Sequence, residues 1–418
     1  MTPPQQGDRG TPSPGANLER VVLHVGLYKT GTTYLQNLLR ENRRSLRRSG
    51  IYLPPRRREV TFAALDLIDR QFRGTRDARV PGAWDRLAAA VYDSGLPTAI
   101  ISEERLSVAT PRQVRRAVAA FASAQVDVVV TVRDLSRVLV SHWQEEVKNG
   151  ATWTLPEYAD ALRDPEGAGS HPARGFWMHE DVTAVLRAWG SAVPVERIHV
   201  VTVPPAGAPS GLLAERFGSV AGFKPRDVAR EGVWTNENVG AVGTELIRRL
   251  NERIGDQMHG IEHERGVKIP LSRALAAMSS KGAVAVPAEH REWAGQTAST
   301  YVQEIRAGGY DVVGDLDDLQ PMPAVGEAGQ PGEPGDAALL EAALEGLSAL
   351  VLRQGKVLAA ADRVASAQRG DLAGRRTRMV TRARNLSFRA KRAAADLAGR
   401  SRTGRRLTAA YVRRRAGR

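Results

Sequence analysis

The segment Val21–Arg40, VVLHVGLYKTGTTYLQNLLR, constrains the fold of this chain more than any other part of it. It begins with a short run of mainly β-branched residues, typical of a buried strand, and it ends with leucines at helical spacing. Between them, Gly26 and Gly31 bound a loop that contains Lys29. Such a loop favours an anion, because its backbone can approach a ligand and the first helical amides point at it. The segment therefore predicts an α/β fold with a phosphate-binding loop.

The order of residues in this loop separates it from an ATP-binding P-loop, in which the lysine follows the last glycine as GK[ST]. Here the lysine precedes the glycine, and the string is Lys29, Thr30, Gly31, Thr32, Thr33. This string resembles the 5′-phosphosulfate loop, K-[ST]-G-T-T, of the sulfotransferases that use 3′-phosphoadenylyl sulfate (PAPS). The resemblance covers about residues 21–321. It implies an α/β fold with a doubly wound parallel sheet and a P-loop-like nucleotide-binding core. It also implies PAPS as sulfuryl donor, a hydroxyl-bearing acceptor (a glycan, a lipid or a small metabolite) and no metal.

A second apolar run, Val126–Val132, is typical of a strand buried in a parallel sheet. Arg133 follows it directly, and Asp134 is predicted to cap the next helix. Ser141 stands eight residues after Arg133. In the sulfotransferases that the loop resembles, an arginine and a serine with this spacing bind the 3′-phosphate of the cofactor. The resemblance thus implies that Arg133 and Ser141 select a 3′-phosphorylated nucleotide.

A third strand is predicted over Thr98–Ser102, and Glu103 and Glu104 follow it. In an open parallel sheet the ligand lies beyond the carboxyl ends of the strands, so the loops after the three predicted strands should converge. Transfer of a sulfuryl group to a hydroxyl requires a base, and glycan-type sulfotransferases use a glutamate at this place. We predict Glu103 as the base, with Glu104 as the alternative if the register is shifted by one residue.

His142 is a rival for the role of base, because the sulfotransferases of small molecules use a histidine. Theirs follows the strand that corresponds to Thr98–Ser102, whereas His142 lies on the helix after the next strand. We therefore expect His142 to be a packed side chain. Lys29 is predicted to neutralise the charge that develops on the leaving nucleotide.

Two other functions remain open at this point. An ATP-dependent P-loop kinase or NTPase would require the GK[ST] order and an acidic strand end for magnesium, and Arg133 occupies one strand end instead. A non-catalytic, membrane-associated protein that binds a nucleotide would keep the loop without turnover.

The chain is predicted to have five parts, distinguished by their composition. The catalytic domain is expected to be preceded by a polar leader and followed by a linker rich in proline and glycine, an Ala/Leu-rich helix and a basic tail. The helix carries apolar residues at heptad steps, but Gly346, Gln354 and Gly355 interrupt the pattern of a coiled coil. Two interpretations stay open: a helix that forms a homodimer, or one that packs on its own domain. The expected boundaries are 1–20, 21–321, 322–336, 337–367 and 368–418.

The positive charge of the chain is concentrated at its C-terminus. Residues 374–418 contain fifteen arginines and Lys391 against the single acid Asp396, a net charge of +15. The whole chain carries +14, so the remainder sums to about −1. Such a tail is expected to bind an anionic surface, with a membrane favoured over nucleic acid because aromatic residues are scarce in it. The chain has no cysteine, which excludes disulfides and leaves the compartment open. The N-terminal residues do not resemble a signal peptide. With the basic tail, this predicts a cytoplasmic protein, peripheral at the inner face of the membrane.

Overall fold

The computed structural model describes residues 18–71, 77–164, 171–224, 227–229, 239–278, 282–322, 334–368, 381–390 and 392–393. Most of the predicted leader, linker and basic tail lies outside these residues. The described chain divides into two compact units, residues 1–346 and 347–418. The first unit contains all the predicted site residues.

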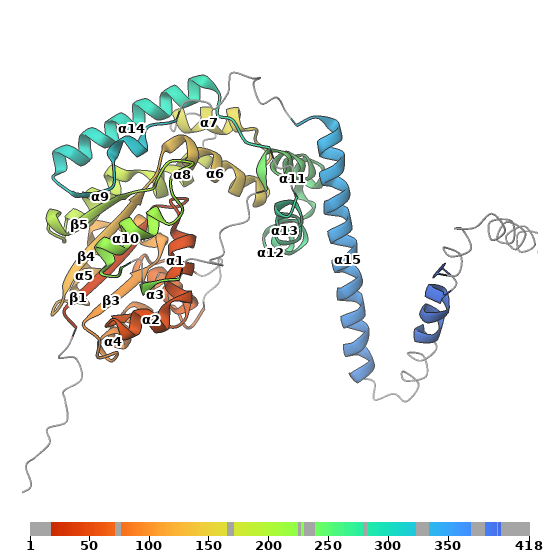
Figure 1. Cartoon of the computed structure of the whole chain (residues 1–418), viewed down its shortest axis with the longest axis horizontal. Helices are drawn as coiled ribbons and strands as arrows, with labels where there is room; N and C mark the ends of the chain where they lie inside the picture. The colour runs from red at the N-terminus through yellow and green to blue at the C-terminus, as the bar shows by residue number, and fades with distance from the viewer. Residues whose placement is uncertain are drawn as a thin grey trace, which may run out of the picture. The chain divides into compact units, whose positions relative to one another are not determined.

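The first unit is built on one sheet, which has six parallel strands in the described part of the chain (Figure 1). The strand order is β2-β3-β1-β4-β5-β6. The strands are β1 (Arg20–Gly26), β2 (Ile51–Tyr52), β3 (Thr98–Ser102), β4 (Gln125–Val132), β5 (Ile198–Thr202) and β6 (Asp311–Val313). The predicted α/β class with a parallel sheet is confirmed.

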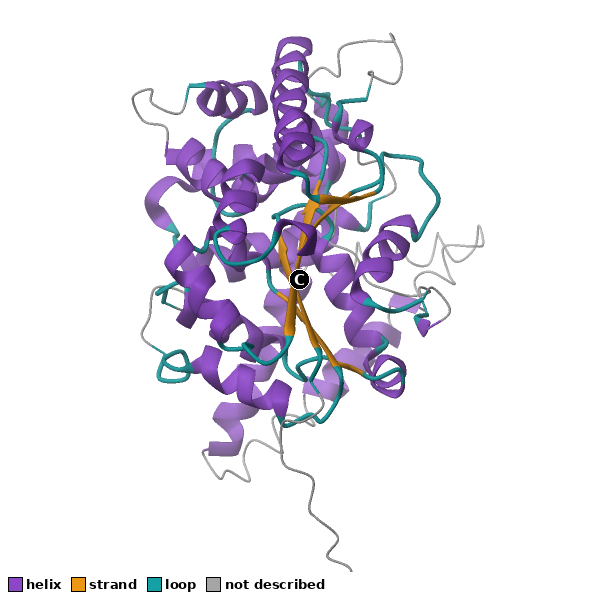
Figure 2. Cartoon of the chain, turned by 90° about the vertical axis from the view of Figure 1, so that its left-hand side faces the viewer, coloured by secondary structure: helices purple, strands orange, loops and turns teal. Residues whose placement is uncertain are grey.

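Helices cover both faces of the sheet, which is seen edge-on in Figure 2. The α-helices of the described residues are α1 (Thr32–Glu41), α2 (Arg43–Arg48), α3 (Arg57–Leu67), α4 (Ala83–Tyr92), α5 (Pro111–Ala119), α6 (Leu135–Lys148), α7 (Leu155–Arg163), α8 (His171–Glu180), α9 (Val182–Gly190), α10 (Leu212–Ala221), α11 (Gly240–Ile254), α12 (Gly260–His263), α13 (Ile269–Ala276), α14 (Ala288–Gly308) and α15 (Asp336–Gln368). Alternate residues of β1 enter different cores, because successive side chains of a strand point to opposite faces. Val21 and Leu23 pack with α3, α4, α5 and α9, whereas Val22 packs with α1, α2 and α10.

The strand order determines which loops meet. β1 lies between β3 and β4, and all three strands run in the same direction. Their carboxyl ends are therefore at one edge of the sheet, where the loops after Gly26, Ser102 and Val132 lie side by side. The predicted convergence of these three loops follows from this topology.

The helix α15 crosses the boundary between the two units. Near its start, Leu339 and Ala342 are buried in the first unit. Other apolar side chains along α15 are exposed, at spacings of three, four and seven residues: Leu340, Leu344, Leu347, Val351 and Leu358. None of the helices among the described residues combines the length and the apolarity that a membrane crossing needs.

Candidate functional site

The loop after β1 has an unusual backbone conformation. Gly26, Lys29 and Gly31 all have positive φ, at 92°, 58° and 85°. Lysine rarely adopts this left-handed conformation, so the surrounding structure must hold the loop in it. A Cβ atom on Gly31 would lie 2.7 Å from Cδ2 of Leu213 in α10. Glycine at position 31 is thus favoured by its backbone conformation, and any larger residue would also displace the end of the Leu213 side chain.

The threonines of this loop have different surroundings. The Thr30 hydroxyl donates to the carbonyl oxygen of Leu27 at 2.6 Å and lies 2.7 Å from the hydroxyl of Thr131 in β4. Thr30 is fully buried, so its side chain joins the loop to β4 and only its backbone can face a ligand. Thr32 and Thr33 open α1, whose N-terminus has no side-chain cap. An uncapped helix N-terminus presents amide donors and a partial positive charge to an anion.

Arg133 connects the end of β4 to the loop. One of its terminal nitrogens, Nη1, donates to the Lys29 carbonyl oxygen at 2.9 Å. Its Nε is buried and has no hydrogen-bond partner in the described part of the chain. Burial lowers the pKa of Arg133 to about 10, with Arg137 contributing in the same direction, so the guanidinium is still charged at neutral pH. The structure thus places a charged arginine, with one free donor, beside the loop.

The Lys29 side chain extends to α6 and reaches Glu145. The Nζ of Lys29 lies 3.0 Å from Glu145 Oε2, and that oxygen also contacts Nζ of Lys148 at 2.8 Å. The other oxygen, Oε1, accepts from Lys268 Nζ at 2.6 Å. Burial raises the pKa of Glu145, but the three lysines together outweigh burial and hold that pKa far below its usual range. One carboxylate therefore holds three cations, which leaves a net charge of about +2 at this place.

Lys268 reaches this cluster through an irregular helical segment. Residues Glu264–Lys268 form a π-helical turn between α12 and α13. Such turns are uncommon and are frequent at functional sites. The Lys268 Nζ also donates to Oδ1 of Asn149 at 2.7 Å, at the end of α6. Ser141 lies on the same face of α6 as Glu145, one turn earlier, and is partly exposed.

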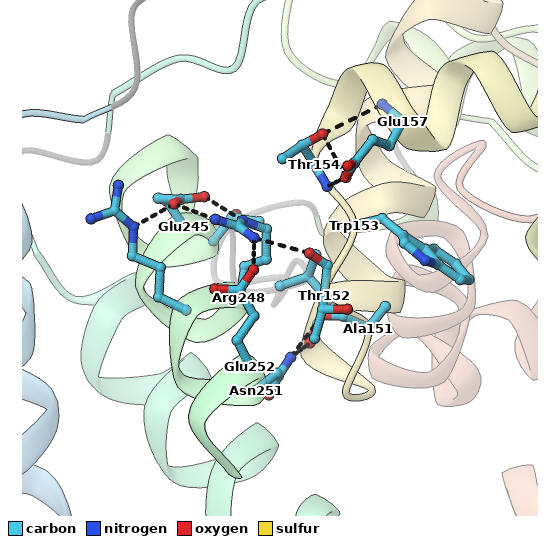
Figure 3. Close-up of polar contacts among 12 residues, drawn as sticks. Ala151, Thr152, Trp153, Thr154, Glu157, Glu245, Arg248, Asn251 and Glu252 are labelled. Atoms are coloured by element: carbon cyan, nitrogen blue, oxygen red, sulfur yellow. Dashed lines mark hydrogen bonds and ion pairs between the residues drawn. The ribbon is translucent and has the colours of Figure 1, made fainter. Parts of the chain in front are cut away.

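A separate network joins α11 to the segment that follows α6, as Figure 3 shows. The Asn251 side chain donates to the carbonyl oxygens of Val147 at 2.7 Å and Ala151 at 2.9 Å. Arg248, which is held by Glu245 on the same helix, donates to the Thr152 carbonyl oxygen at 3.0 Å. These bonds tie α11 to the last turn of α6, through Val147, and to the segment that follows α6, through Ala151 and Thr152.

The two glutamates after β3 face different partners. Glu103 is only 2% exposed, and it accepts hydrogen bonds from the Thr61 hydroxyl at 2.9 Å and from Arg105 Nη1 at 2.6 Å. Burial raises the pKa of Glu103, and the neighbouring Glu104 adds to this effect. Glu104 is partly exposed and accepts from Gln36 Nε2 of α1 at 2.7 Å. Both carboxylates are therefore at the predicted edge, with Glu103 on the side of α3 and Glu104 on the side of α1.

A buried acid that the sequence did not single out lies on the other side of the loop. Glu180 is the last residue of α8, because the Asp181 side chain accepts from Ala184 N and starts α9. Oε1 of Glu180 lies 3.3 Å from His142 Nε2. Burial raises the pKa of Glu180 well above its usual value and lowers that of His142 to about 3. His142 is therefore neutral at neutral pH, Glu180 gives up its proton less readily than an ordinary carboxyl group, and His142 is the packed side chain that we expected.

The structure brings together most of the predicted site, and it adds residues that sequence reasoning missed. Lys29 and Arg133 are in direct contact. The additions are Glu180 and Lys268, neither of which belongs to a motif. The one signal for the cluster in the sequence was the helical spacing of Ser141, Glu145 and Lys148. Among the described residues, no group of histidines and carboxylates is arranged to hold a metal ion.

Comparisons with known proteins add little. No family model matches the chain, and no curated protein is similar to it in sequence. One solved structure is similar, the crystal structure of a sulfotransferase from Alicyclobacillus acidocaldarius. It is 14% identical, with a TM-score of 0.40, and the match covers 70% of this chain and 95% of that chain. At this similarity, the function of the chain must be argued from its own residues.

Proposed function

We propose that this chain is a sulfotransferase that moves the sulfuryl group of PAPS to a hydroxyl-bearing acceptor. The observation that carries the proposal is the buried arginine beside the anion loop. Arg133 donates to the Lys29 carbonyl, and its Nε has no partner among the residues that the structure describes. A buried donor without a partner is costly, and a phosphate oxygen would satisfy it.

The loop fits the 5′-phosphosulfate part of the same molecule. The N-terminus of α1 is not capped by a side chain, so Thr32 and Thr33 can bind through backbone amides and hydroxyls. Thr30 contributes through its backbone alone, because its hydroxyl is used within the fold. Ser141, partly exposed on α6, is the predicted partner of Arg133 for the 3′-phosphate. We infer no role for a metal, since Lys29 and the helix N-terminus supply positive charge.

PAPS would supply the sulfuryl group: a new bond forms from the acceptor oxygen to sulfur as the bond from sulfur to the phosphate oxygen breaks, which leaves adenosine 3′,5′-bisphosphate (PAP). Lys29 would stabilise the negative charge on the leaving phosphate oxygen. To do so it must exchange Glu145 for the ligand, and Lys148 and Lys268 would keep Glu145 in position. The proton of the acceptor hydroxyl passes to a carboxylate of the protein.

Glu103 remains our candidate for that base. Its raised pKa makes it a better proton acceptor near neutral pH than an ordinary carboxylate. Thr61 and Arg105 hold its orientation: Oε1 accepts from the Nη1 and the backbone N of Arg105, whereas Oε2 accepts from Thr61 alone and keeps a lone pair for the proton. Glu104, bonded to Gln36, is the alternative.

Isothermal titration of the protein with PAP, 5′-AMP and ATP tests the proposal. PAP should bind more tightly than 5′-AMP, and Arg133→Ala should weaken PAP about 10- to 100-fold while changing 5′-AMP little. Equal losses for the two nucleotides would remove Arg133 from the 3′-phosphate site. Tight magnesium-dependent binding of ATP with weak PAP binding would favour a kinase or NTPase. Transfer of labelled sulfate from PAPS to compounds in a cell extract distinguishes an enzyme from a protein that only binds the nucleotide.

A further inference from the structure

A pocket lies beside β3, on the side of α1 that is away from Arg133. Its walls come from α1, the segment after β2, the start of α3, and the β3 residues Ile100 and Ser102. Ser102 directly precedes the two candidate bases, and Gln36 of α1 joins the pocket to one of them through its bond to Glu104. The pocket is thus adjacent to the predicted chemistry without being part of the nucleotide loop.

Two polar atoms of the pocket lining have no partner. The Gln36 amide nitrogen donates to Glu104, so the amide atom left over is the acceptor Oε1. Oε1 is buried and makes no hydrogen bond within the described chain. Nε of Arg43 is likewise buried and unpartnered there, although Nη2 donates to the Pro54 carbonyl oxygen at 2.8 Å. Two residues that line the pocket therefore each carry a buried polar atom without a partner among the described residues, one an acceptor and the other a charged donor, and such atoms are costly to leave unpaired.

The charge of the lining is positive. Three arginines line the pocket, Arg40, Arg43 and Arg57, and no aspartate or glutamate does among the described residues. Arg40 and Arg57 are exposed and form its rim, whereas Arg43 is partly buried. The rest of the wall is largely apolar, from Leu39, Leu53, Val60 and Ile100. Guanidinium groups over an apolar wall suit a ligand with an anionic group on an apolar body.

The sheet order places this pocket opposite the predicted 3′-phosphate site. Arg133 follows β4, on one side of β1, and the pocket borders β3, on the other side. The loop that would hold the phosphosulfate follows β1 itself and so lies between them. A donor that extends from Arg133 to the loop leaves the β3 side for the second substrate.

We propose, on the basis of the sulfotransferase function above, that this pocket receives the acceptor, and that the acceptor is a small molecule with a hydroxyl group, an anionic group and an apolar body. The anionic group binds Arg43, with Arg40 and Arg57 at the rim. The hydroxyl end lies toward Gln36 and Ser102, next to Glu103. Gln36 acts as a positioning residue, held by Glu104.

The test uses two matched probes, 4-hydroxybenzoate and its methyl ester, which differ in the negative charge. Binding of each is measured by titration calorimetry on the full chain, with and without PAP. The wild type should prefer the carboxylate by about tenfold or more. Arg43→Leu should abolish this preference, and Arg57→Leu should reduce it about two- to threefold. Arg44→Leu is the matched control, because Arg44 is exposed and does not line the pocket; it should retain the full preference.

Each outcome decides for or against the acceptor pocket. The absence of a preference in the wild type, whether both probes bind or neither does, would overturn the proposal, as would an equal loss in Arg44→Leu. If circular dichroism shows that Arg43→Leu is unfolded, the Arg57→Leu result decides. PAP binding should be unchanged in all three variants. A wild type that shows the preference but does not bind PAP would overturn the sulfotransferase function and leave only an anion pocket, whereas PAP binding without the preference would overturn the pocket alone.

Discussion

Single residues decide the chemistry at the edge of the sheet, and adjacent residues can have opposite surroundings. Glu103 and Glu104 are neighbours, yet the first is buried against Thr61 and Arg105 and the second is partly exposed against Gln36. The motif that predicted a carboxylate at this strand end could not separate the two. Their roles depend on which face of the strand end each side chain occupies.

Glu103→Gln keeps the shape of the side chain and removes the base, so it should lower turnover about 10²- to 10⁴-fold. The affinity for PAP should be nearly unchanged. Turnover is measured as labelled sulfate transferred from PAPS to acceptors in a cell extract. Glu104→Gln is the matched comparison and should have a smaller effect, through Gln36. Retained turnover in Glu103→Gln with loss in Glu104→Gln would assign the base to Glu104.

Glu180 gives a prediction about stability and pH. Its folded pKa is raised well above the usual value by burial, so in the folded state it keeps its proton at a pH where the unfolded chain has lost it. Stability must then fall as pH rises from about 4.5 toward the folded pKa, by up to about 1.4 kcal/mol per pH unit. Glu180→Gln removes this loss. It should raise the melting temperature at pH 7 and have little effect near pH 4.

The control for Glu180→Gln is Glu196→Gln, because Glu196 is exposed. Its melting temperature should follow that of the wild type at every pH. A Glu180→Gln protein that is less stable at pH 7 would show that the ionised carboxylate is stabilised by Lys29 and Arg133, contrary to the direction of the pKa.

The sequence predicted those parts of the site that are local along the chain, and it could not predict the parts that depend on packing. Lys29, Gly31 and Arg133 stand next to strand ends, where short-range pattern determines their position. Lys268 reaches Glu145 across 123 positions and through a π-helical turn. No periodicity indicates such a turn. Likewise, the sequence gives no sign that Gln36 and Arg43, which lie on two different helices, line one pocket beside β3.

At the scale of elements, the Glu145 cluster joins three parts of the fold: the anion loop, α6 and the π-helical segment before α13. The α11 network, part of which is drawn in Figure 3, bonds to the last turn of α6 and to the segment after it. It therefore limits the movement of the part of α6 that carries Glu145 and Lys148. In this arrangement Glu145 competes with any anion for Lys29. These elements therefore keep Lys29 beside the loop, in an ion pair with Glu145, until the ligand takes the place of the Glu145 carboxylate.

Glu145→Gln should strengthen PAP binding about fivefold at low salt, because the lysines keep their charge and lose the competing carboxylate. The gain should shrink at high salt, where exposed charges are screened. Titration calorimetry at two salt concentrations measures both effects, with Glu196→Gln as the control. Weaker PAP binding in Glu145→Gln would instead show that Glu145 is needed to orient Lys29.

At the scale of the whole molecule, the proposed site and the positive charge of the chain lie in different parts of the sequence. The site lies in the first unit, whereas the net charge of +15 lies in residues 374–418. Of that segment, residues 381–390 and 392–393 are helical and exposed, and the rest lies outside the described residues. The exposed leucines of α15 fit the expected homodimer through 337–367, which stays a prediction. Catalysis and attachment are therefore expected to be separable.

Deletion of residues 374–418 should leave PAP binding intact, because every residue of the proposed site precedes the deleted segment. It should remove the association with anionic lipid, since arginines on an exposed segment act through a field that is screened over about 10 Å at moderate salt. Sedimentation with liposomes that contain or lack anionic lipid, at low and high salt and with a nucleic-acid competitor, compares the full chain with the truncated one. Equal pelleting of the two proteins would exclude the tail as the anchor, and competition by nucleic acid at low concentration would point to that partner instead. Loss of PAP binding on truncation would show that the tail contributes to the nucleotide site, and the separation of catalysis from attachment would then be wrong.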